Sequence, residues 1–347
     1  MQEDLDDIET SLGGTPERAG PGFFAPEQMV RCDACLRANP PTRTACLYCG
    51  AALPIKEDGP ALQRPTLRQL EKWEQGYNSI ILPQEGRELS VEELSETASW
   101  LRLDAEELKS ILGAREPLPL ARTASPEEAA LIDRRLGALG FRVLTVADKD
   151  LFEDEARPVR VRAAEINEHE LVLHPTGGAV PASLNWTELT LLFTGRLRTS
   201  RVEVEERRKR GPERELVNAS EMSADEQVLD IYTGHVGESF RIAANNFDYS
   251  SLGGRKRLVV AENFQELVRV FRERAPRAAL DDSYGGVRRA LAAVWRPEQR
   301  TEAGGLRHGG LGKFNTGSMT VTDNEAQLTR YSRLRRFLRL KHPELFR

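Results

Sequence analysis

Residues 32–49 read CDACLRANPPTRTACLYC and hold all four cysteines of the 347-residue chain. The cysteines form two C-x-x-C pairs that are separated by ten residues. A C-x-x-C pair on a tight turn directs two sulfur atoms to one side, and four thiolates can enclose a metal ion tetrahedrally. The pattern therefore predicts one structural zinc ion, with no coordination position left open for catalysis, bound by Cys32, Cys35, Cys46 and Cys49.

Two other uses of these cysteines are less favoured. A redox dithiol needs a single C-x-x-C pair, whereas two matched pairs are typical of metal binding. Two disulfides would need an oxidising compartment, but the first ten residues, MQEDLDDIET, are acidic and lack the apolar stretch of a signal peptide. We therefore expect a reducing, cytoplasmic setting, and a small zinc ribbon in such a setting favours a bacterial protein.

The spacing Cys-x2-Cys-x3-Asn-x6-Cys-x2-Cys, with Asn39 at the asparagine position, resembles the Ran-binding-protein type zinc finger. The same residues also resemble the short zinc ribbons of bacterial proteins, and the resemblance covers residues 30–52. The Ran-binding type usually has a tryptophan two residues before the first cysteine, where this chain has Val30. That difference argues against RNA recognition in the manner of that family.

Length and charge indicate an acidic chain of several domains. It has 49 lysines and arginines against 54 aspartates and glutamates, a net charge of −5, so its overall charge does not favour nucleic acid. No apolar run approaches the roughly 20 residues of a membrane-spanning helix. We divide the chain into an acidic, disordered lead-in (1–28), a zinc ribbon (29–54), a small α+β domain (66–150), a β domain (156–280), and a glycine-rich segment with a basic helical tail (281–347).

The domain at 66–150 combines helices and strands. A short helix is expected at 66–75 after a linker at 55–65, and a strand at 78–83. Ser90 and Asp104 are helix N-caps, each followed three residues later by glutamate, and Ser125-Pro126-Glu127-Glu128 begins a third helix. With strands on both sides, residues 117–147 resemble the split βαβ units of small α/β binding domains, which implies an architecture and no reaction. The acidic run 148–155 is interpreted as a solvated linker.

Residues 156–280 read as six or seven short strands followed by an amphipathic helix at 262–276. This order predicts a strongly bent, partly open β-barrel that the helix closes. It resembles a pleckstrin-homology-like domain, with Asn185–Leu189 similar to the tryptophan-containing third strand of bacterial members. The resemblance implies binding of protein, peptide or lipid. The loop at 166–170, where lipid-binding members usually carry basic residues, is INEHE, which disfavours phosphoinositides.

Two basic runs, 207–210 and 330–341, leave several readings open. Either run is a solvated face or an anion contact. The second run surrounds an apolar helical stripe of Leu328, Tyr331, Leu334 and Leu338. The favoured reading is a helix that packs on the preceding domain with a solvated basic face; the others are a membrane-surface or nucleic-acid contact, or an intramolecular or inter-subunit clamp. The glycine-rich stretch 304–318 does not fit a phosphate-binding loop, because Phe314 follows Gly312-Lys313.

The sequence offers no pattern that indicates catalysis. Its five histidines are scattered, and the acids of most interest, Asp230, Asp248, Asp281 and Asp282, match no two-metal spacing. We therefore expect a non-enzymatic adaptor, of mixed α+β multidomain fold, that binds another protein through the β domain. The alternative is a nucleic-acid binder that uses the zinc ribbon and the basic C-terminal helix. Contact with a membrane surface is less favoured, and no small-molecule substrate is evident.

Overall fold

The computed structural model describes residues 24, 28–43, 45–51, 53–54, 70, 74–84, 89–151, 157–208, 214–234, 239–308 and 314–346. The chain forms two compact units, residues 1–66 and 67–347. The predicted lead-in and the linker at 55–65 lie almost wholly outside the described residues, as does most of the helix expected at 66–75.

The first unit contains one small antiparallel ribbon. Strand β1 (Val30–Arg31) pairs with β2 (Ala38–Asn39), with Val30 opposite Asn39. Val30 and Leu53 are buried together with Cys32 and Cys46. The core of this unit therefore consists in part of the cysteines themselves.

The second unit begins with a split βαβ arrangement. Its three-stranded sheet has the order β4-β3-β5, and both outer strands run antiparallel to β3. The elements are β3 (Tyr77–Ile81), α1 (Val91–Leu101), α2 (Ala105–Gly113), β4 (Leu118–Thr123), α3 (Pro126–Ala138), β5 (Val143–Ala147) and α4 (Asp148–Leu151). The predicted topology is confirmed, because β4 and β5 are parallel to each other and α3 connects them.

The predicted helix starts are confirmed as well. The Ser90 hydroxyl accepts a hydrogen bond from the Glu93 N–H, and the Glu93 carboxylate accepts one from the Ser90 N–H. Asp104 and Glu107 form the same reciprocal pair. Ser125 caps α3, with Pro126 in the first turn. These side chains satisfy backbone N–H groups that have no partner within the helix.

The acidic run after β5 differs from the prediction of a solvated linker. Asp148 is buried and belongs to α4, and its carboxylate accepts hydrogen bonds from the Gly76 N–H (2.8 Å) and the Arg122 guanidinium (2.8 Å). Pairing with a cation and an N–H offsets the cost of burying a carboxylate. Sequence patterning did not reveal this partner, which lies 26 residues away.

The rest of the unit is built on a curled, half-barrel sheet with the order β13-β14-β9-β10-β11-β6-β7-β8. A further strand, β12, pairs in parallel with β9. The strands are β6 (Val159–Ile166), β7 (Glu170–Pro175), β8 (Ala182–Asn185), β9 (Leu189–Arg208), β10 (Arg214–Thr233), β11 (Ser239–Ala243), β12 (Ala279–Asp281), β13 (Glu298–His308) and β14 (Phe314–Asp323). Helix α5 (Val260–Arg274) packs on this sheet through Phe264, Leu267 and Phe271.

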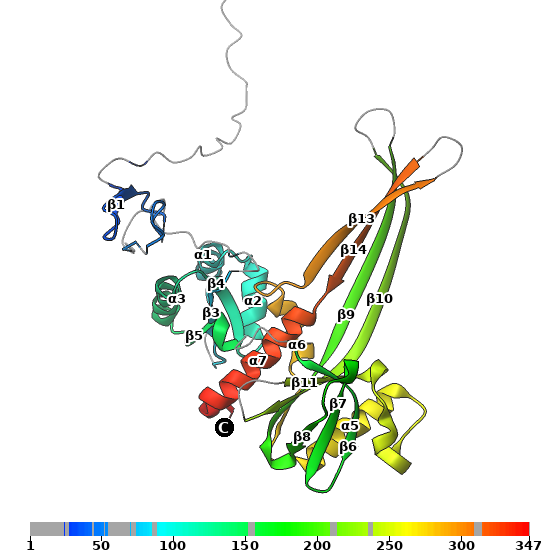
Figure 1. Ribbon diagram of the computed structural model, residues 1–347. Helices are drawn as coiled ribbons and strands as arrows, with labels where there is room; N and C mark the ends of the chain where they lie inside the picture. Colours follow the sequence, from blue (N-terminus) through cyan, green and yellow to red (C-terminus); the bar gives the residue numbers. More distant parts are fainter. Residues whose placement is uncertain are drawn as a thin grey trace, which may run out of the picture. The chain divides into compact units, whose positions relative to one another are not determined.

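Strands β9 and β10 are much longer than the short strands predicted, at 20 residues each. Residues 214–225 belong to β10, which the sequence analysis did not resolve as one long strand. Residues 199–208, 214–225, 298–308 and 314–323 extend together as a four-stranded arm beyond the core (Figure 1). Most side chains of the arm are exposed or partly exposed, and only residues 201–205 alternate between apolar and charged residues. Hydrophobic patterning therefore did not show that these four segments extend together.

Trp186 also departs from its predicted place in a strand. It lies in a short 3-10 turn, Trp186–Glu188, between β8 and β9. The indole is buried, donates a hydrogen bond to the Asn167 carbonyl (3.0 Å) and packs edge-on against Phe271 of α5. Trp186 therefore connects the sheet to its covering helix.

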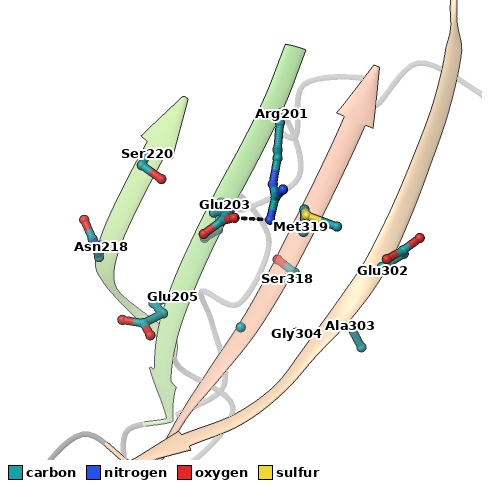
Figure 2. A pocket seen from close by; sticks show the side chains of 12 residues that line it. Arg201, Glu203, Glu205, Asn218, Ser220, Glu302, Ala303, Gly304, Ser318 and Met319 are labelled. Atoms are coloured by element: carbon teal, nitrogen blue, oxygen red, sulfur yellow. Dashed lines mark ion pairs between the residues drawn. The ribbon is translucent and has the colours of Figure 1, made fainter. Parts of the chain in front are cut away.

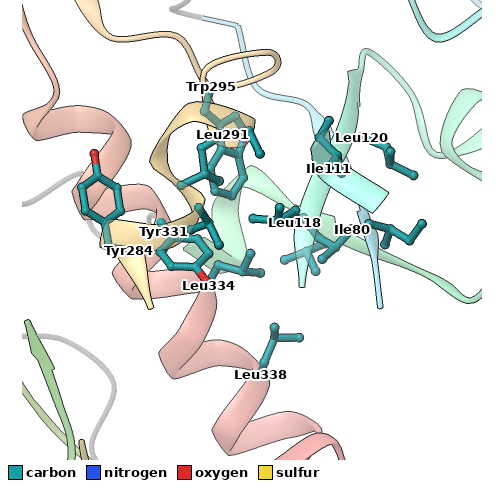
Figure 3. Close-up of a cluster of buried hydrophobic side chains, with 14 of the residues drawn as sticks. Ile80, Ile111, Leu118, Leu120, Tyr284, Leu291, Trp295, Tyr331, Leu334 and Leu338 are labelled. Carbon is teal, nitrogen blue, oxygen red and sulfur yellow. The ribbon is translucent and has the colours of Figure 1, made fainter. Parts of the chain in front are cut away.

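The C-terminal segment belongs to the same sheet and core. The glycine-rich stretch supplies parts of β13 and β14, and β14 pairs with β9. Helices α6 (Tyr284–Leu291) and α7 (Glu325–Lys341) bury Leu291, Tyr331 and Leu334 against Ile80 and Leu118 of the split βαβ part (Figure 3). The segments predicted as separate domains at 66–150, 156–280 and 281–347 thus share one compact unit.

The basic residues of α7 are mostly not solvated. Arg335 is buried, and the guanidinium groups of Arg330, Arg336 and Arg339 stack on the rings of Trp295, Tyr232 and Phe346. Lys341 is the one exposed basic residue of α7. Of the readings left open for run 330–341, the structure agrees with the intramolecular clamp.

Candidate metal centre

The two cysteine turns of the first unit have the same backbone geometry. In the first turn, the Leu36 N–H donates to the Cys32 carbonyl (2.8 Å), and in the second the Gly50 N–H donates to the Cys46 carbonyl (3.0 Å). Leu36 and Gly50 both have positive φ, +60° and +73°. Glycine adopts this conformation easily, whereas leucine does so at a cost in free energy.

A second pair of hydrogen bonds repeats the same pattern. The Cys32 N–H donates to the Arg37 carbonyl (3.0 Å) and the Cys46 N–H donates to the Ala51 carbonyl (2.8 Å). The second bond of each pair lies 14 residues after the first, in this pair as in the pair made by Leu36 and Gly50. The local fold is therefore built from two equivalent turns that face each other.

This arrangement brings together all four predicted ligands. The Sγ atoms of Cys32, Cys35, Cys46 and Cys49 lie within 4.8 Å of one another. Two of the separations are 3.6 Å (Cys32 to Cys49) and 3.5 Å (Cys35 to Cys46). A tetrahedral site with metal–sulfur bonds of about 2.3 Å needs sulfur atoms about 3.8 Å apart. Four sulfur donors at these distances could hold one metal ion, which is consistent with zinc.

Asn39 supports the cluster from a fully buried position. Its side-chain carbonyl accepts a hydrogen bond from the Leu47 N–H (2.8 Å), and its amide donates to the Arg37 carbonyl (2.9 Å) and to the Cys46 sulfur (3.5 Å). Asn39 therefore connects the two turns and contacts a ligand. Such neighbours orient metal ligands and adjust their affinity for the ion.

The same groups make the four thiols chemically unequal. Burial opposes ionisation of Cys46, but N–H groups from Tyr48 and Cys49, with Cys35 and Asn39, lower its pKa to about 6. For Cys49, the Ala51 N–H favours the thiolate, but neighbouring sulfurs and burial raise its pKa to about 12. Because metal binding requires all four thiolates, loading the site must release protons.

The acids that the sequence singled out have structural roles where they are buried. Asp230 and Arg241, both fully buried, face each other with two guanidinium–carboxylate contacts of 2.6 and 2.8 Å. Ser332 of α7 donates a hydrogen bond to the same carboxylate (3.0 Å), and Thr329 accepts one from Arg241 (3.0 Å). The ion pair therefore fastens α7 to the sheet.

Asp281 is in a similar position at the end of β12. Its carboxylate accepts from Arg335 of α7 (2.6 Å) and from the Ser283 hydroxyl (2.6 Å). Asp248 only caps the turn that begins at Tyr249, through Ser250, and Asp282 is exposed. Within the described residues, the four cysteines are the one group of three or more histidine, cysteine, aspartate or glutamate side chains that could hold a metal ion.

Two cavities lie elsewhere in the second unit. One, of about 200 Å³, lies on the arm among Arg201, Glu203 and Glu302, where Gly304 and Gly317 approach closely (Figure 2). The other, of about 620 Å³, is lined by seven arginines and three acidic residues. There, burial and the neighbouring Arg122 lower the pKa of Arg330 to about 10. Sequence reasoning indicated neither cavity, since their lining residues come from distant segments.

No protein-family model, no curated protein and no solved structure matches this chain. Among the described residues, no helix has the length and apolar character needed to cross a membrane.

Proposed function

We propose that this chain is a non-enzymatic, zinc-binding interaction protein that binds a partner protein through the edge of its half-barrel sheet. In this proposal, the four cysteines hold a structural zinc ion in a zinc ribbon, and the half-barrel with α5 is a pleckstrin-homology-like domain. The ribbon needs the metal because so short a segment buries too little apolar surface to fold alone.

The observation that carries the proposal is the outer edge of β10. Residues 216–226 pair with β9 on one side, and no described strand pairs with their other side. Leu216 and Met222 on this stretch are 62% and 58% exposed. Unpaired N–H and carbonyl groups on such a long edge recruit other strands, and this edge carries exposed aliphatic side chains beside the acidic residues Glu221, Asp225 and Glu226. An edge with exposed aliphatic side chains suits an extended peptide that adds as a further strand.

Affinity purification with edge variants of the full chain tests this proposal. Leu216→Lys with Met222→Lys should reduce recovery of the partner at least about tenfold, because lysines on an edge oppose strand addition. Val91→Lys is the matched control, since Val91 is 79% exposed on α1, away from the sheet edge. Equal recovery with the edge variant and the control would contradict the proposal. A chain lacking residues 29–54 shows whether the ribbon itself recruits the partner.

Nucleic-acid binding is a second candidate, favoured by one observation on the first unit. The Arg37 guanidinium lies 4.7 Å from the centre of the Tyr48 ring, and Tyr48 is exposed. Exposed aromatic rings and guanidinium groups are surfaces on which single-stranded bases stack. Helix α7 supports this candidate less than its sequence implied, because its arginines pack within the second unit. Binding that weakens steeply with salt and is lost in Arg37→Ala with Tyr48→Ala would favour it.

A further inference from the structure

Three consecutive aliphatic residues lie in water just before and at the start of α5. Leu258 is as exposed as in an extended chain (103%), and Val259 and Val260 are 52% and 41% exposed. Every residue from Gly253 to Glu262 is exposed. This segment, drawn in yellow, lies at the outer edge of the half-barrel part of the unit (Figure 1). These aliphatic side chains leave much of their apolar surface in water when the chain folds. A contiguous run of such residues on a surface often marks a binding site.

The segment is held in this exposed conformation. Asn263, a buried residue of α5, accepts a hydrogen bond from the Arg257 N–H (2.6 Å) and donates one to the Arg257 carbonyl (2.9 Å). The Lys256 N–H donates to the carbonyl of Gly253, which has positive φ. These hydrogen bonds hold the backbone just before Leu258, and the Leu258 side chain is exposed to solvent.

The helix start also departs from the residue types that water favours. Val259 occupies the N-cap of α5 and makes no side-chain capping hydrogen bond. Serine, threonine, aspartate and asparagine are strongly preferred at this position, and valine is among the poorest choices. By contrast, Ser90, Asp104 and Ser125 cap the starts of α1, α2 and α3. A valine at the N-cap is better suited to an apolar environment than to water, so we expect the start of α5 to be buried when a partner binds there.

The surrounding charge selects the kind of partner. Arg255, Lys256 and Arg257 precede the aliphatic residues, and residues 255–277 contain seven basic and three acidic residues, a net charge of +4 in a chain of net charge −5. Arg255 faces Glu266 and Glu273 at 3.7 and 3.6 Å. Because exposed pairs of this kind are weak, Arg255 can exchange these partners for phosphate groups. The patch therefore complements an anionic surface.

The chemistry favours a lipid surface over a protein partner. Leucine and valine are under-represented among the residues that dominate protein–protein binding. None of residues 253–262 lines either cavity described above, so no groove accompanies the exposed side chains. Aliphatic side chains next to basic residues are typical of segments that insert into the interface of anionic bilayers.

We propose that residues 255–260 form a membrane-docking tip, in which Leu258, Val259 and Val260 enter the interface of an anionic bilayer and the preceding basic residues contact its headgroups. The tip lies outside the 166–170 loop and the two basic runs considered from sequence. It acts independently of the metal centre and of the β10 edge.

Vesicle flotation with the full chain tests the proposal. We expect binding to phosphatidylcholine vesicles that contain about 30% phosphatidylserine, weaker binding to pure phosphatidylcholine, and a decrease with added salt. Leu258→Asn should reduce the bound fraction roughly tenfold, by removing the apolar insertion. Lys256→Gln with Arg257→Gln should lower binding to anionic vesicles and leave binding to neutral ones unchanged.

The matched control is Val91→Asn, which removes a similarly exposed aliphatic side chain from α1. It should bind like the unchanged chain. Absence of flotation with anionic vesicles would overturn the proposal, as would equal loss in Leu258→Asn and Val91→Asn. Retained capture of the β10 partner by Leu258→Asn would show that the variant is folded.

Discussion

The two units of this chain differ in whether the residues of the core are also the residues that we propose for binding. In the first unit, Cys32 and Cys46 belong to the four-cysteine group that could hold a metal ion, and they also make up half of the buried core. In the second unit, two large apolar clusters form the core, while the arm, the β10 edge and the tip before α5 lie outside them. If the proposed metal is bound, we expect that the small unit cannot lose it and keep its fold, whereas substitutions on the exposed surfaces of the large unit should cost little stability.

Removing the metal should give the largest effect and affect one unit only. Structural zinc contributes apparent binding free energies of about 10–16 kcal/mol in small zinc modules. We expect about one zinc ion per chain by elemental analysis, and loss of ordered structure at residues 28–54 on chelation or in Cys32→Ser with Cys35→Ser. Thermal unfolding of the second unit should stay unchanged. Stoichiometric zinc in the double variant would contradict the assignment of these ligands.

Breaking a buried ion pair should give the largest effect within the second unit. Asp230→Ala leaves the buried Arg241 with Glu325, at 3.4 Å, as its remaining carboxylate partner. Loss of the closer partner should reduce the free energy of unfolding by about 3 kcal/mol in denaturant titrations, the lower end of the range for a broken buried pair. Asp225→Ala is the control, because its partner Arg196 is exposed and such pairs contribute about 0–1 kcal/mol. Similar losses in both variants would mean that Asp230 does not fasten α7 to the sheet.

What the sequence predicted well was local. The caps at Ser90, Asp104 and Ser125, the apolar stripe of α7 and the clustering of the four cysteines are each defined by residues within a few positions or by one short motif. Such signals need no knowledge of distant contacts, because a cap or a C-x-x-C turn is completed by its immediate neighbours.

What the sequence did not reveal depends on distant partners. The sequence indicated that Asp148 belongs to a solvated linker, because it does not show that the Arg122 guanidinium lies beside the Asp148 carboxylate. The arm is mostly exposed or partly exposed, and part of its register follows from pairing between strands that are far apart in sequence, as between Arg207 of β9 and Asn315 of β14. The tip before α5 could have been noticed, since Leu-Val-Val stands where a polar cap is expected.

The supporting residue Asn39 should matter less than the ligands but still measurably. Asn39→Ala removes the hydrogen bonds to Leu47 and Cys46, and the loss of such a neighbour typically weakens metal affinity about 10- to 100-fold. Asn39→Asp keeps an acceptor for the Leu47 N–H but places a buried carboxylate beside the Cys46 sulfur, so its affinity should fall at least as far as that of Asn39→Ala. Competition with a chromophoric chelator measures both, and an unchanged affinity in Asn39→Ala would show that the turns hold their geometry without it.

Acid should weaken the second unit through Asp281. Burial opposes ionisation of this carboxyl, but Arg335 and the Ser283 N–H and hydroxyl lower its pKa below the usual value. A carboxyl with a lowered pKa stabilises the fold above its unfolded pKa of about 3.9, and this contribution is lost as the pH falls through the folded value. Each tenfold change in proton affinity corresponds to about 1.4 kcal/mol. Asp281→Asn should therefore flatten the pH dependence of unfolding below about pH 4; an unchanged slope would assign it to other carboxyls.

The smallest effect should come from the two equivalent cysteine turns, which differ at one backbone position. Gly50 has positive φ and open space around its Cα, so Gly50→Ala adds backbone strain and no clash. We expect a loss of about 1 kcal/mol, or about fivefold in metal affinity. Leu36 already carries this strain at φ +60°, so Leu36→Gly should strengthen binding by up to a similar factor. Opposite shifts in chelator competition would establish that the turns are equivalent, whereas weaker binding in Leu36→Gly would mean that the exposed Leu36 side chain itself stabilises the unit.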